Sequence, residues 1–141
     1  MRKITILFIA VLLVAASFVG CSDDSVIEIT DRAFINRTFD IMQNSDRYLG
    51  RTIQLEGIFW IFPTQGADRH FIIRYTLGCC GDDGMVGFEL RMDDIAQLPA
   101  EDTWIEITGV LEAIEGAGPG RVQLHVVSLT EHEEWGTFFV Q

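Results

Sequence analysis

The chain has 141 residues, 48% of them hydrophobic, with 21 acidic side chains against 10 basic ones and a formal net charge of −11 at pH 7. Once a leader is set aside, this length allows one domain of ordinary size and no second one. A surface this acidic repels phosphate groups, so nucleic acid is not an expected partner.

The first 20 residues have the pattern of a bacterial lipoprotein signal peptide. Two basic residues precede an apolar run over 4–16, and Gly20 stands immediately before Cys21. The run is shorter than a full membrane span, which favours a cleaved leader over an uncleaved anchor. We therefore expect cleavage before Cys21 and lipidation of its thiol. The acyl chains would then hold the protein at a membrane, the cell membrane or an outer membrane, facing away from the cytoplasm.

The exported chain divides into a tether and one domain. Residues 21–29 are polar and acidic and are predicted to be a lipidated tether without a folded role, and residues 30–141 form the domain. From Thr30 the spacing of apolar residues predicts a helix, with Thr30 or Asp31 as its cap. The expected apolar stripe consists of Phe34, Ile35, Phe39 and Met42.

Five later segments alternate apolar and polar residues, which is typical of half-buried strands. They cover residues 52–59, 68–76, 86–92, 104–112 and 122–129. Gly57 and Gly109 stand inside two of them, where barrel strands commonly bend. The sequence predicts a mainly β domain: a small five-stranded barrel of the oligonucleotide/oligosaccharide-binding (OB) type, preceded by one helix. A flat sheet covered by the helix is the competing arrangement.

Two adjacent cysteines, Cys79 and Cys80, are the strongest candidates in this chain for redox chemistry or metal binding. They lie between glycines, so a turn can bring both sulfurs to one side. They can form a labile vicinal disulfide, remain free, or bind zinc or copper(I). A closed zinc site needs four ligands, and Asp83 and His70 are the nearest candidates. The alternative is a buried or oxidised structural pair.

A second candidate feature is an aromatic cluster just before Pro63. Phe59, Trp60 and Phe62 are expected to form a contact surface at one end of the barrel, together with Arg74. The alternative is that the aromatic side chains belong to the hydrophobic core.

Several runs resemble one bacterial family, whose members are described as subunits of a two-component membrane permease. The similar runs are Ile29–Asp31, Tyr48–Phe59, Arg74-Tyr75, Cys79-Cys80 with Asp83, Val86-Gly87 and Trp104–Glu112. The resemblance is to the family's extracytoplasmic OB-like domain and covers residues 29–129. It implies an integral membrane permease as partner. Here a lipid anchor replaces the membrane-spanning region that usually precedes this domain.

The sequence thus predicts a non-enzymatic, lipid-anchored binding or accessory module. No Cys-x-x-Cys pair is present, and no serine–histidine pairing indicates a hydrolase. The alternatives are a thiol-redox protein that uses Cys79 and Cys80, or a purely structural envelope lipoprotein.

Overall fold

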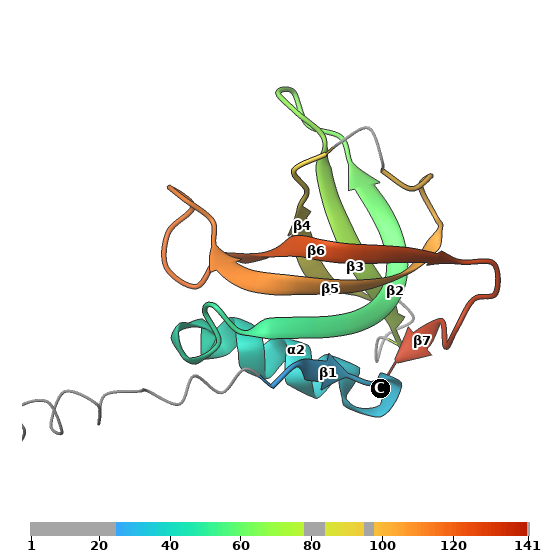
Figure 1. Cartoon of the computed structure of the whole chain (residues 1–141), viewed down its shortest axis with the longest axis horizontal. Helices are drawn as coiled ribbons and strands as arrows, with labels where there is room; N and C mark the ends of the chain where they lie inside the picture. The colour runs from blue at the N-terminus through green and yellow to red at the C-terminus, as the bar shows by residue number, and fades with distance from the viewer. Residues whose placement is uncertain (1–24, 78–83, 95–97, 141) are drawn as a thin grey trace, which may run out of the picture.

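The computed structural model describes residues 25–77, 84–94 and 98–140. In this part of the chain there are seven strands, one α-helix and two short 3-10 turns (Figure 1). The elements are β1 (Ile27–Ile29), η1 (Asp31–Ala33), α2 (Phe34–Gln43), η2 (Ser45–Arg47), β2 (Thr52–Phe62), β3 (Arg69–Thr76), β4 (Gly84–Arg91), β5 (Trp104–Ala113), β6 (Val122–His132) and β7 (Phe139–Val140).

The strands form one mixed sheet in the order β1-β2-β5-β6-β4-β3-β7, and β2 also pairs with β3. Strand β2 pairs with β5 and also with β3. The five longer strands, β2, β5, β6, β4 and β3, therefore form a closed ring of pairings, in which the last strand pairs with the first. Three pairs are parallel: β1–β2, β3–β7 and β4–β6. The five predicted segments are all strands, but the count of five is not confirmed, since the short β1 and β7 belong to the same sheet.

Strand β2 is long and strongly curved, as Figure 1 shows. Up to Ile58 it pairs with β5, and from Ile58 it pairs with β3. Gly57 lies where the partner changes. A Cβ at Gly57 would stand 2.7 Å from the carbonyl oxygen of Ile73, so no larger residue fits without a shift. The glycine therefore allows β2 to bend tightly against β3.

The helix begins later than the sequence predicts, and its buried face is rotated. Phe34, Thr38 and Ile41 are buried, whereas Phe39 is about half exposed. Of the predicted stripe, Phe34 is buried and Ile35 and Met42 are half-buried, and the stripe left out the buried Thr38 and Ile41. Thr30 stands at the N-cap position of η1, which leads directly into α2, but its side chain makes no cap hydrogen bond, and Ala33 is the residue before α2 itself.

The domain also begins before residue 30. Ile27–Ile29, the last part of the predicted tether, forms β1 and pairs in parallel with β2. Ile29 is buried in the core. The Ile-Glu-Ile sequence of β1 alternates, but three residues are too few to distinguish a strand from a polar tether.

Two hydrophobic clusters lie on opposite faces of the sheet. The larger one fills the inside of the curved sheet and includes Phe34 and Ile41 from α2. The smaller one lies on the outer face, around Ile58, Ile73 and Trp104, with Trp60, Phe71 and Tyr75 packed against it. An outer face with an apolar cluster of its own is unusual for a small sheet protein, and it forms the candidate site.

Candidate interaction surface

The outer face of β2, β3 and β4 carries an apolar groove. Its volume is about 240 Å³, and it is lined by Trp60, Phe62, Phe71, Ile73, Met85 and Gly87. Alternation along each strand places these residues on one side of the sheet. Register brings them together, because Trp60 is opposite Phe71. Phe62 and Met85 remain 54% and 56% exposed, so the groove is open to a partner.

A ladder of aromatic rings extends this surface toward the end of the chain. Trp135 lies 6.1 Å from Trp104 and 5.7 Å from Phe138, and Phe138 stacks on Tyr75 at 4.7 Å between ring centroids. Tyr75 is opposite Met85 in the β3–β4 register, which joins the ladder to the groove. Trp135 and Phe138 pack on other aromatic rings, yet both keep more than a third of their surface exposed.

Arg74 does not lie on the predicted contact surface. Its side chain is 1% exposed and lies near the point where β2 stops pairing with β5 and begins to pair with β3. There Nε donates to the carbonyl of Glu56 at 2.9 Å, Nη1 donates to the carbonyl of Thr137, and Nη2 pairs with Asp31 at 2.9 Å. The guanidinium also lies 4.4 Å from the ring centre of Trp104. Arg74 therefore ties both ends of the domain to its centre.

The surroundings of Arg74 act on its proton affinity in two directions. Burial lowers the pKa of Arg74, because desolvation disfavours the charged form, while the carboxylate of Asp31 opposes that shift. The paired carboxylate and two backbone carbonyls satisfy the buried cation. The residue is thus a structural hub, and the prediction that it contacts a partner was wrong.

Phe59 is also buried rather than exposed. It has 0% exposure, belongs to the inner core and stacks on His70 at 5.7 Å. Alternation explains the error: Phe59 points inward, whereas its neighbours Trp60 and Phe62 point outward. Of the four residues predicted to form the contact surface, Trp60 and Phe62 line the groove, and Phe59 and Arg74 are buried.

The groove also contains Phe71, Ile73 and Met85, which were not predicted. Alternation shows that they point outward, but the sequence does not show which strands pair and so does not bring them together.

Of the four proposed metal ligands, His70 alone lies in the described part of the chain. Cys79, Cys80 and Asp83 lie outside the described residues, as does Cys21. His70 lies at the start of β3, six residues before Thr76 and therefore about 20 Å from that end of the strand. Among residues 25–77, 84–94 and 98–140, no three histidine, cysteine or acidic side chains are grouped to hold a metal. The zinc or copper(I) site stays a prediction.

Comparison with known proteins places the chain in a family. The profile of the DUF1980 C-terminal domain matches residues 16–137. The chain belongs to the DUF1980 C-terminal domain family. It is also 28% identical over 117 residues to the UPF0703 protein YcgQ of Bacillus subtilis, covering 82% of this chain and 39% of that protein. The chain thus spans about two fifths of the length of this relative.

Among solved structures, the DUF1980-type domain is similar to part of the asparaginyl-tRNA synthetase of Entamoeba histolytica, solved with asparaginyl-adenylate. The identity is 15% and the TM-score 0.42, over 77% of this chain and 23% of the synthetase. In the described part of the chain, no helix is both long and apolar enough to cross a bilayer.

Proposed function

We propose that the protein is a lipid-anchored, extracytoplasmic accessory module that docks on an integral membrane partner through its outer apolar groove. In this proposal the ring of five longer strands is an OB-like barrel, and Cys21 carries the anchor. The partner is a membrane permease, as the resemblance of residues 29–129 implies. The module binds its partner and does no chemistry on it.

The open groove is the observation that carries this proposal. Exposed apolar patches on small domains commonly mark binding sites, and aromatic side chains dominate the energy of protein interfaces. Burying one side chain such as Phe62 gains about 1.5–3 kcal/mol. The groove and the adjoining aromatic ladder offer several such side chains on one face. The exposed apolar side chains of the groove contribute this burial energy only when a partner covers them.

The position of the groove supports a protein partner over the lipid surface. The chain enters the domain beside the start of β2, where Arg51 contacts Ser25. Trp60 and Phe62 lie at the other end of that 11-residue strand. Cys21 is only four residues before Ser25, which limits the tether to about 15 Å. A lipid at Cys21 would therefore keep the start of β2 close to the bilayer, whereas Trp60 and Phe62 lie at the far end of that strand.

Quantitative co-purification from native membranes tests the proposal. The full chain and its Phe62→Ser and Met85→Ser variants are extracted in mild detergent, and the recovered membrane proteins are compared. We expect one permease-type protein with wild type and a loss of at least about tenfold in each variant, because exposed hot-spot side chains carry interface energy. Phe39→Ser is the matched control, since Phe39 is 49% exposed on α2, outside the groove and away from β6. Equal recovery from all variants would contradict the proposal.

A further inference from the structure

A second opening lies between β4 and β6, away from the apolar groove. On one side β6 pairs with β5 along its whole length, from Val122 to His132. On the other side, among the described residues, it pairs with β4 only from Gln123 to His125. The following seven residues of β6, 126–132, have no described strand partner on that side. We call this opening the seam.

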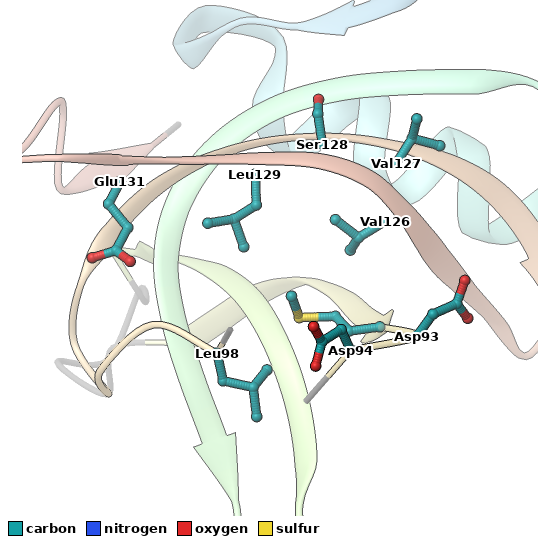
Figure 2. Close-up of a pocket in the computed structure, with 9 residues that line it drawn as sticks. Asp93, Asp94, Leu98, Val126, Val127, Ser128, Leu129 and Glu131 are labelled. Atoms are coloured by element: carbon teal, nitrogen blue, oxygen red, sulfur yellow. The ribbon is translucent and has the colours of Figure 1, made fainter. Parts of the chain in front are cut away.

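The seam holds a groove of about 590 Å³ with an apolar floor. Val126 and Leu129 of β6 point into it, and Leu98 faces them from the β4–β5 connection, while Val127 and Ser128 point away (Figure 2). A bulge produces this arrangement, because the β5–β6 register shifts between Thr108 and Gly109. The extra residue resets the alternation of β6, so that Val126, Leu129 and Glu131 line the same groove.

The charged groups of the seam are acidic. Asp93, Asp94 and Glu131 line the groove, and no lysine or arginine is among its described lining residues. The negative charge of Asp93 is partly neutralised, because its carboxylate lies 2.9 Å from Nε2 of His125 and 3.1 Å from Nη1 of Arg91. The formal net charge of −11 adds a long-range attraction for cations.

We propose that the seam binds an extended basic segment of a partner protein, which adds to β6 as a further strand. A strand edge offers backbone donors and acceptors to an incoming chain, and the side-chain pockets beside it give specificity. An incoming strand alternates its side chains between two faces. Apolar side chains on one face meet Val126, Leu129 and Leu98, and a basic side chain at its margin meets Glu131.

This site is independent of the apolar groove and of the lipid anchor. The groove lies on the outer face of β2, β3 and β4, whereas the seam lies along β6, and the two share no lining residue. A partner that engages both would be held at two points. Either surface can fail its test without affecting the other.

The test measures binding of a labelled, end-blocked Val-Lys-Val-Lys-Val-Lys peptide to the full chain in detergent. We expect saturable binding, weakened at least tenfold when glutamate replaces lysine in the peptide. Glu131→Gln should weaken binding about two- to fivefold, the usual contribution of one exposed charge pair. Glu28→Gln is the matched control, because Glu28 is exposed on β1, outside the seam. It should leave binding unchanged.

Hydrogen exchange then separates strand addition from general attraction. The basic peptide should slow backbone amide exchange in residues 126–131 and leave the start of β2 unaffected. Spermine, which is cationic but has no backbone to pair, should give no such protection. Equal binding of the acidic peptide, equal loss with Glu28→Gln, or binding without protection of β6 would each overturn the proposal. If a seam variant misfolds, weakened binding of wild type at high salt provides the same check.

Discussion

At the residue scale, Arg74 shows most clearly how this chain holds itself together. Its partners stand far apart in the sequence, with Asp31 before it and Thr137 after it. Alternation on β3 correctly groups Arg74 with the inward Ile72, so its burial could have been expected. Its partners could not, because nothing local in the sequence indicates which distant carboxylate and carbonyls meet a buried cation.

Replacing Arg74 by methionine should lower the free energy of unfolding by about 3 kcal/mol. The change leaves the side chain of Asp31 and two carbonyls without their donor. Arg74→Lys should recover little of the loss, since one ammonium cannot reach three separate acceptors. Urea denaturation of the full chain measures both. Arg32→Met, at an exposed position, should change stability by less than about 0.5 kcal/mol. A similar loss of stability in Arg74→Met and Arg32→Met would contradict the structural role of Arg74.

Asp40 and Tyr48 provide a pH-dependent contact. The hydroxyl of Tyr48 donates to Asp40 and lowers the pKa of that carboxyl, with Asn44 as a second donor. A lowered carboxyl pKa stabilises the fold above its ordinary value near 3.9, and the gain is lost as pH falls through the lowered value. Tyr48→Phe should therefore be less stable than wild type at pH 7, with the gap narrowing below about pH 4.

Chemical denaturation at several pH values follows the stability gap between Tyr48→Phe and wild type. Asp40→Asn completes a double-mutant cycle, which should show coupling at pH 7 and little at pH 3. A stability gap that stays constant over this range would mean that the hydroxyl does not act through the charge of Asp40.

At the scale of elements, alternation predicted all five long strands to within a few residues. Alternation missed β1 and β7 because they have only three and two residues; each is a strand only through its pairing with a longer one. The helix was found by its period, but Thr38 shifted its buried face. The candidate surface needed the pairing as well, because Phe71 and Met85 join Trp60 only through register.

Close contact between β3 and β4 makes Gly87 sensitive to any side chain. A Cβ there would stand 1.8 Å from the carbonyl oxygen of Ile72, so the strands must separate to accept one. Gly87→Ala should cost about 3 kcal/mol of unfolding free energy. Gly66→Ala is the matched control, since nothing lies within 4 Å of its added Cβ. Thermal unfolding should separate the two variants clearly; equal melting temperatures would contradict this packing.

At the scale of the whole molecule, the domain carries two candidate binding surfaces. The groove lies on the outer face of β2, β3 and β4, and the seam lies beside β6. The sequence predicted the class of the fold and an aromatic contact surface. It could not predict the seam, which depends on how far β4 accompanies β6.

Membrane attachment should depend on Cys21. Intact-mass measurement of the purified chain should show loss of residues 1–20 and the added mass of acyl chains. Cys21→Ser should remove that mass and release the protein from washed membranes, because the acyl chains provide the attachment. Retention of the unmodified variant on membranes would show that another contact holds it there.

The most direct test of the docking proposal is site-specific photo-crosslinking in living cells. A photoreactive phenylalanine analogue at position 62 should give one crosslinked membrane protein, identified by mass spectrometry as permease-like. The crosslink should disappear when Met85→Ser is added. The same probe at position 39, which is 49% exposed on α2, should not give this product. No crosslink at position 62, or the same products at both positions, would contradict docking through the groove.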